Sequence, residues 1–262
     1  MIQGLLRFTP LLILSSSLLT GCVSERVYTG TDIPVVERVF DNVSAAKQRA
    51  QLGLRYLQRG NSAQAKFNLN KAIKFAPNIE AVNVSMAYYY QTVGELDLAE
   101  TYYRKSINSS DATGDGMNNF GVFLCQQKKY AESEKVFLKA IKLPLYTRAA
   151  ASYENLGICS RKAGNLEKAQ KYFTVALKYD PRRRVSLIEL TEIDVDSGDY
   201  IEARAQLARY HRVIAESVES LTLGITIERG LDDPDAVRQF GILLLAKFPA
   251  SVEAKQYRAS MQ

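Results

Sequence analysis

The feature that most constrains the fold is a repeat of about 34 residues. A large residue followed by a small one recurs at spacings of 34, 34 and 36, in Leu52-Gly53, Met86-Ala87, Phe120-Gly121 and Leu156-Gly157. A second small residue follows twelve positions after the first, at Ala65, Ala99, Ser133 and Ala169. Four positions later comes a large residue, at Leu69, Tyr103, Phe137 and Phe173. Since this spacing is helical, each unit is predicted to be two amphipathic helices joined by a short turn.

The pattern resembles the tetratricopeptide repeat, which has this period and these small and large positions. The resemblance implies an all-α superhelix over residues 44–262 with about six units, at 46–79, 80–113, 114–147, 150–183, 184–216 and 217–250. The fifth unit is weaker, because Thr191 stands where a small residue is expected. Terminal repeats diverge because one face meets water, and residues 251–262 are predicted to form a capping helix.

The N-terminal segment carries a second pattern. One positive residue, Arg7, precedes an apolar run that ends in Leu19-Thr20-Gly21-Cys22, which is the layout of a secretory signal. The Cys after a small residue resembles the lipobox of bacterial lipoproteins. This resemblance implies that residues 1–21 are removed, that Cys22 is acylated, and that residues 22–43 form a flexible tether. The alternatives are a transmembrane anchor or an ordinary signal peptide with a chance Cys.

The resemblance to lipoproteins also suggests a location in the cell. In such lipoproteins, Asp after the lipidated Cys signals retention in the inner membrane, and Val23 stands there instead. The expected location is therefore the outer membrane, lipid-anchored and facing the periplasm.

Composition narrows the class of protein. Apolar residues make up 47% of the 262 residues, which is enough for a sizeable core and argues against wholesale disorder. The formal charge is +6, and Arg7 is the only charge in residues 1–21, so +5 remains after cleavage. This charge is spread along the chain and does not indicate a nucleic-acid partner. The tight basic run Arg182–Arg184 is predicted to be a solvated loop.

Two cysteines remain once Cys22 is assigned to the lipid. Cys125 and Cys159 lie on the first helices of neighbouring units, so a disulfide is conceivable in the oxidising periplasm. Two separate buried thiols are the alternative, and only geometry decides between them.

No constellation of catalytic residues is found in the sequence. The single histidine, His211, has no Cys or carboxylate at metal-ligand spacing and is interpreted as a surface or partly buried residue. No Gly-rich phosphate loop or nucleophile elbow is present. We therefore expect neither an enzyme nor a metal or other cofactor.

Recognition of a partner is the expected role. In tetratricopeptide proteins that bind peptides, the first helices line a concave groove. The resemblance places eight residues in that groove: Leu54, Leu57, Val84, Tyr88, Asn119, Val122, Asn155 and Ile158. Asn119 and Asn155 match the family position whose amide bonds the backbone of a bound peptide. Such an apolar lining suits an apolar or β-edge segment, although these residues could instead pack against a second helix.

Three strings resemble signatures of the PilF/PilW lipoproteins of type IV pilus biogenesis, at residues 51–61, 118–124 and 153–157. The resemblance implies a pilotin, expected to be monomeric. A pilotin binds the outer-membrane secretin of the pilus machine and promotes its localisation and multimerisation, and twitching motility depends on it. The alternative is a repeat scaffold lipoprotein of another envelope system, such as outer-membrane β-barrel assembly.

Overall fold

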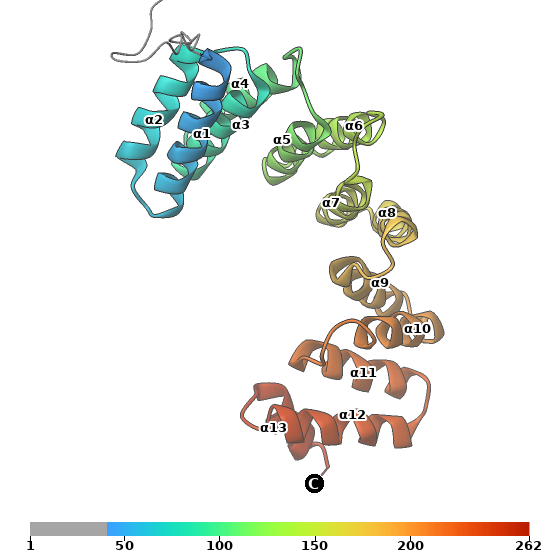
Figure 1. Ribbon diagram of the computed structural model, residues 1–262. Coiled ribbons are helices and arrows are strands. Elements are labelled where there is room, and N and C mark those ends of the chain that lie inside the picture. Colours follow the sequence, from blue (N-terminus) through green and yellow to red (C-terminus); the bar gives the residue numbers. More distant parts are fainter. Residues whose placement is uncertain (1–40, 262) are drawn as a thin grey trace, which may run out of the picture. The chain divides into compact units, whose positions relative to one another are not determined.

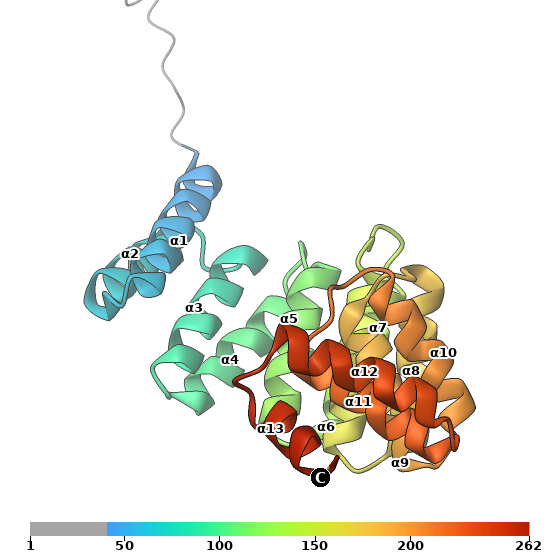
Figure 2. The ribbon, with the colours of Figure 1, turned by 90° about the horizontal axis from the view of Figure 1, so that it is seen from below.

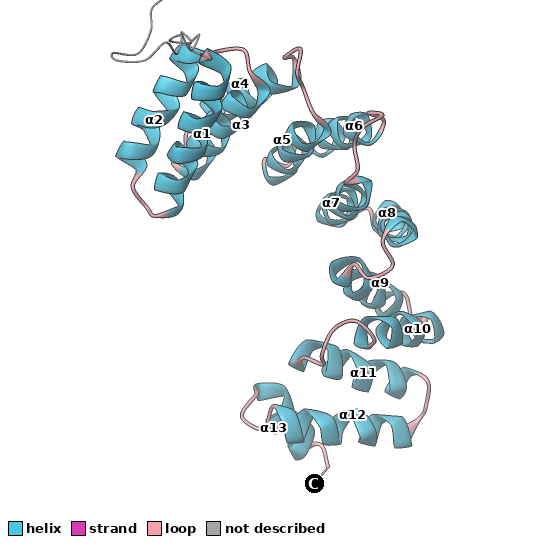
Figure 3. Cartoon of the chain, in the orientation of Figure 1, coloured by secondary structure: helices cyan, strands magenta, loops and turns pink. Residues whose placement is uncertain are grey.

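Residues 41–261 are described in a computed structural model, and this part of the chain contains helices and loops but no strand (Figures 1 and 3). The first helices of six successive pairs are α1 (Asn42–Gln58), α3 (Glu80–Thr92), α5 (Gly114–Gln126), α7 (Ala149–Lys162), α9 (Arg184–Asp196) and α11 (Val218–Gly230). The second helices are α2 (Ser62–Phe75), α4 (Leu96–Ile107), α6 (Tyr130–Ile141), α8 (Leu166–Tyr179), α10 (Tyr200–His211) and α12 (Pro234–Lys247). A final helix, α13 (Val252–Ala259), follows. The prediction of an all-α tetratricopeptide-repeat superhelix is confirmed.

Local capping explains where many helices begin. A short polar side chain accepts a hydrogen bond from the backbone of the first turn at Asp41, Asn61, Thr113, Asn165, Asp199, Ser217, Asp233 and Ser251. These residues satisfy N–H groups that have no partner within the helix. Since Asp41 caps α1, that helix starts inside the last two residues of the stretch predicted as tether. The predicted signal peptide, Cys22 and tether residues 23–40 lie outside the described residues.

The turn inside each repeat needs a left-handed backbone. Gly60, Gly94, Gly164 and Gly198 take φ angles of 76°, 85°, 77° and 77° there. Glycine adopts this conformation without a steric penalty. Lys128 in the third repeat and Asp232 in the sixth occupy the equivalent places with φ angles of 60° and 57°, so these two turns carry backbone strain that the other four avoid.

Each helix pair closes where a small residue meets a large one. A Cβ atom added to Gly121 would lie 2.7 Å from the ring of Phe137, and one added to Gly157 would lie 2.6 Å from the ring of Phe173. Both rings are fully buried. The missing side chain is therefore what lets the two helices pack closely enough to enclose the ring.

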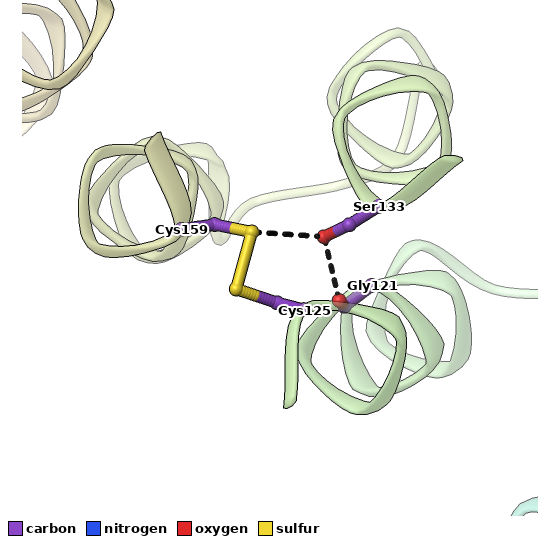
Figure 4. The surroundings of a disulfide bond; sticks show 4 residues. All are labelled: Gly121, Cys125, Ser133 and Cys159. Atoms are coloured by element: carbon purple, nitrogen blue, oxygen red, sulfur yellow. Dashed lines mark hydrogen bonds between the residues drawn. A yellow bond between two sulfur atoms is a disulfide. The ribbon is translucent and has the colours of Figure 1, made fainter. Parts of the chain in front are cut away.

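Cys125 and Cys159 form a disulfide between α5 and α7, which decides the question left open by the sequence (Figure 4). Their Cα atoms are 5.7 Å apart, within the range a disulfide requires. Ser133 lies beside the bridge, where its hydroxyl donates to the carbonyl of Gly121 at 2.7 Å. The third and fourth repeats are thus joined covalently through their first helices.

The basic run Arg182–Arg184 differs from the prediction of a solvated loop. The guanidinium of Arg183 donates to the buried carboxylate of Glu154 at 2.6 Å, and Arg184 is already the first residue of α9. Arg182 stays exposed. The prediction was wrong for Arg183 because its partner lies 29 residues away, on the preceding first helix.

The close approach at Gly157 predicts the effect of adding one methyl group. Overpacking costs about 1–3 kcal/mol, whereas alanine gains roughly 0.5–1 kcal/mol over glycine within a helix. We expect Gly157→Ala to lower the free energy of unfolding by roughly 1–2 kcal/mol, measured by chemical denaturation. Unchanged or increased stability would show that α7 and α8 approach less closely than described.

The disulfide predicts a defined loss on mutation. The bridge closes a loop of 34 residues, and constraining the unfolded chain in this way contributes roughly 3–4 kcal/mol. We expect the double variant Cys125→Ala/Cys159→Ala to lose about that much stability, whereas reduction of the variant should change nothing further. Alkylation of the unreduced, denatured protein at both cysteines would contradict the assignment.

Candidate partner-binding surface

The first helices of the repeats form one continuous layer. Each packs against the next, from α1 on α3 through α5, α7 and α9 to α11. The second helices reach the following repeat through its first helix, as α2 does with α3 and α4 with α5. Figure 2 shows this succession from below. The layer of first helices is therefore the face on which several repeats can contact one extended partner.

Side-chain hydrogen bonds hold neighbouring first helices together within this layer. We call each contact between two neighbouring first helices a seam. The side-chain oxygen of Asn118 on α5 accepts from the Ser152 hydroxyl at 2.8 Å and from the Asn155 amide at 3.1 Å, both on α7. One repeat later, Glu154 accepts from the backbone N–H and the hydroxyl of Ser186 on α9, at 3.1 and 2.8 Å. Since equivalent positions are used twice, the register between neighbouring first helices is set by hydrogen bonds as well as by packing.

A second buried carboxylate lies between α3 and the start of the third repeat. Glu80 on α3 accepts from the Thr113 hydroxyl at 3.0 Å, and its own backbone N–H donates to Asp111. Burial raises the pKa of Glu80, and the Thr113 hydrogen bond opposes that rise. The seam between the second and third repeats is therefore also held by a partly desolvated acid.

The eight predicted groove residues are not equally exposed. In the first repeat Leu57 is 7% exposed and belongs to a core cluster with Ala50, Leu69 and Met86, so it offers little surface. Leu54 beside it is half-buried. Tyr88 on α3 is 47% exposed and is the large side chain of the predicted set that is most available to a partner.

Three of the predicted residues contribute mainly to packing. Val84, Val122 and Ile158 are half-buried and pack against the buried clusters that join neighbouring repeats. The two asparagines differ from each other. Asn119 is exposed, whereas Asn155 is half-buried and donates to Asn118. Of the two, only Asn119 makes no side-chain hydrogen bond within the described residues.

A row of polar side chains links neighbouring first helices near their C-terminal ends. The Gln91 amide donates to Gln126 at 2.8 Å, and the Tyr103 hydroxyl donates to Gln91 at 2.9 Å. Burial raises the pKa of Tyr103, so its hydroxyl stays a donor at physiological pH. One repeat on, Arg161 pairs with Glu189 and Glu192 of α9. Burial lowers the pKa of Arg161, but the two glutamates outweigh it and leave the pKa raised.

Sequence reasoning missed two parts of the surface. In the first repeat, the exposed fraction of the side chains is 36% at Leu52 and 52% at Phe67, which adds apolar area there. In the last repeats a hollow of about 600 Å³ opens beside Arg161, with Glu192, Asp196 and Leu223 among its lining residues. The sequence does contain a pattern at this place, because Glu189, Glu192 and Asp196 recur at the spacing of one helix face.

His211 has no ligand-like surroundings. It is half-buried near the ring of Phe240, and burial lowers its pKa. Across residues 41–261 there is no group of three His, Cys, Asp or Glu side chains able to hold a metal ion. In the same part of the chain, every helix is too short or too polar to cross a membrane.

Comparison with known proteins shows which class of protein this chain belongs to. The tetratricopeptide repeat family matches residues 49–79, 81–113 and 112–182, so this is a tetratricopeptide-repeat protein. The type IV pilus assembly protein PilF of Pseudomonas aeruginosa is 31% identical over 241 residues, which cover 92% of this chain and 94% of that protein. An uncharacterised protein of Haemophilus influenzae is 36% identical over 144 residues, covering 55% and 80%.

Solved structures agree with this. That of Pseudomonas aeruginosa PilF superposes with a TM-score of 0.69 at 30% identity, covering 84% of this chain and 99% of that one. The structure of PilW, a type IV pilus biogenesis factor, gives 0.67 at 28% identity, covering 80% and 97%. The chain belongs to the PilF/PilW family of tetratricopeptide-repeat proteins of type IV pilus biogenesis. Fold and relatives point to a non-catalytic repeat protein.

Proposed function

We propose that the protein is a pilotin, a lipoprotein of the outer membrane that binds the type IV pilus secretin and promotes its localisation and multimerisation. The observation that carries this proposal is the similarity to a type IV pilus assembly protein along 92% of the chain. Because that similarity spans the whole repeat array, the array itself is the part expected to act in pilus assembly. The β-barrel assembly scaffold considered from the sequence receives no comparable support.

The proposed binding surface lies on the first helices of the first three repeats. Tyr88 and half-buried Leu54 come from neighbouring first helices that pack against each other. Asn119 on α5 supplies an exposed amide that can donate to and accept from a peptide backbone at once. Together these groups suit an extended apolar segment of the secretin.

The proposed membrane anchor is the lipid on Cys22. Gly21 precedes this Cys in the pattern that resembles a lipobox, and Val23 follows it. Acylation would hold the repeat array at the membrane into which the secretin inserts, because several acyl chains anchor a protein far more firmly than one. Delivery and binding are thus assigned to separate parts of the chain.

The experiment separates these two parts. Full burial of a large apolar side chain contributes about 1.5–3 kcal/mol, which corresponds to roughly 10- to 100-fold in affinity. We expect Tyr88→Glu to weaken binding of the full chain to the purified secretin by about that factor. Ile201→Glu is the control, because Ile201 is 76% exposed on α10, away from the proposed surface.

In cells, Cys22→Ser should leave secretin binding intact but reduce the amount of secretin multimer in the outer membrane. Normal multimers in this variant would remove the lipid from the mechanism. Equal affinities of Tyr88→Glu and Ile201→Glu for the secretin would remove the early repeats from it.

A further inference from the structure

One edge of the repeat array carries an unexplained apolar residue. Each second helix ends on this edge and the next first helix begins there, so the connection 142–148 between α6 and α7 lies on it. The side chain of Leu145 in that connection is 94% exposed. The described part of the chain also begins on this edge, since Asp41 caps the N-terminus of α1.

The loop that carries Leu145 is held by its neighbours. Leu143 and Tyr146 pack against the buried cluster that the second and third repeats share. The Tyr146 hydroxyl lies 2.7 Å from that of Ser152, and its ring fills the space over Gly114. The two residues flanking Pro144-Leu145 thus point inward while Leu145 points outward. Its exposure follows from a fixed loop.

Positive charge gathers along the same edge. Every second helix has a basic residue in its last turn, at Lys74, Lys105, Lys139, Lys178, Arg209 and Lys247. Lys142 and Arg182 add to them in the connections. Within residues 41–261, the side chains of Lys139, Lys142, Lys178 and Arg182 form no ion pair.

Carboxylates near these cations are already engaged. Asp115 pairs with Arg148 at 3.1 Å, and Asp111 accepts the backbone N–H of Glu80 at 3.0 Å. Asp180 accepts the backbone N–H of Arg182 at 3.1 Å. Asp111 and Asp180 keep their negative charge, but the four unpaired cations Lys139, Lys142, Lys178 and Arg182 outnumber them. The middle of this edge therefore carries a net positive charge around an apolar tip.

The helix dipole explains only part of this arrangement. A cation in the last turn is favoured by the partial negative charge at the end of a helix, which accounts for Lys139 and Lys178. The dipole gives no reason for the exposure of Leu145, or for Tyr179, which is 60% exposed at the end of α8. An apolar tip, an interfacial aromatic side chain and unpaired cations together are the groups that bind an anionic bilayer surface.

We propose that this edge, formed by Lys139, Lys142, Leu145, Lys178, Tyr179 and Arg182, docks on an anionic lipid surface. The lipid surface is the one that holds the chain's own N-terminus, so the inference rests on the proposed acylation of Cys22. The 18 residues between Cys22 and Asp41 span on the order of 60 Å at most. The edge thus stays within reach of that surface. Tyr88 and Asn119 lie within first helices and remain free for a protein partner.

The absence of tryptophan from the chain allows a direct test. The full chain carrying Leu145→Trp is purified from bacterial envelopes and reconstituted in vesicles of phosphatidylethanolamine and phosphatidylglycerol. The indole emission is expected to shift to shorter wavelength, with several-fold stronger quenching by brominated acyl chains than in the control. The control is Ile201→Trp, in the first turn of α10 on the opposite edge, in a chain anchored by the same lipid.

Charge is tested on the same probe. Lys142→Glu with Lys178→Glu in the Leu145→Trp chain should abolish most of the shift, and phosphatidylcholine vesicles should give little shift at all. Equal quenching of the two tryptophan probes in anionic vesicles would overturn the proposal. A shift in Leu145→Trp that survives both charge reversal and zwitterionic lipid would overturn the anionic part. Neither readout involves the secretin, so failure here is distinct from failure of the proposed function.

Discussion

The described structure depends on how closely the two helices of each repeat approach one another. Gly53 faces the buried side chain of Leu69. The same contact recurs with the buried rings of Phe137 and Phe173, at Gly121 and Gly157, and with the half-buried ring of Phe240, at Gly224. A Cβ atom at any of these glycines would overlap its partner. Because this contact recurs at multiples of the repeat period, these four pairs close in the same way, and like pairs can stack one after another.

Stacking then decides which residues remain available for function. Contacts between neighbouring repeats occupy several side chains that the sequence places in the groove. Val84, Val122 and Ile158 pack between repeats, and Asn155 donates to Asn118. The disulfide of Cys125 with Cys159 joins the same layer of first helices. Of the predicted groove residues, Tyr88 and Asn119 remain exposed and available to a partner.

The sequence predicted the helix pairs well because residue volume at fixed spacing is a local property. It could not separate Leu57 from Tyr88, since both lie on first helices and only the packing of α1 against its neighbours buries the former. It missed the pairing of Arg183 with Glu154 for a similar reason, as the two residues are 29 positions apart. The disulfide likewise needed the distance between two helices. Long-range geometry, rather than local pattern, made the difference in each case.

Three tasks are proposed for three parts of the chain: the N-terminal lipid anchors it in the membrane, the early first helices bind a protein partner, and the basic edge docks on the membrane surface. The central claim is that the early first helices contact the secretin. Site-specific photo-crosslinking from position 88 in pilus-forming cells tests it most directly, with position 201 as the reference. We expect an adduct with the outer-membrane secretin from position 88 alone. An adduct with a β-barrel assembly factor instead, or the same adducts from both positions, would contradict it.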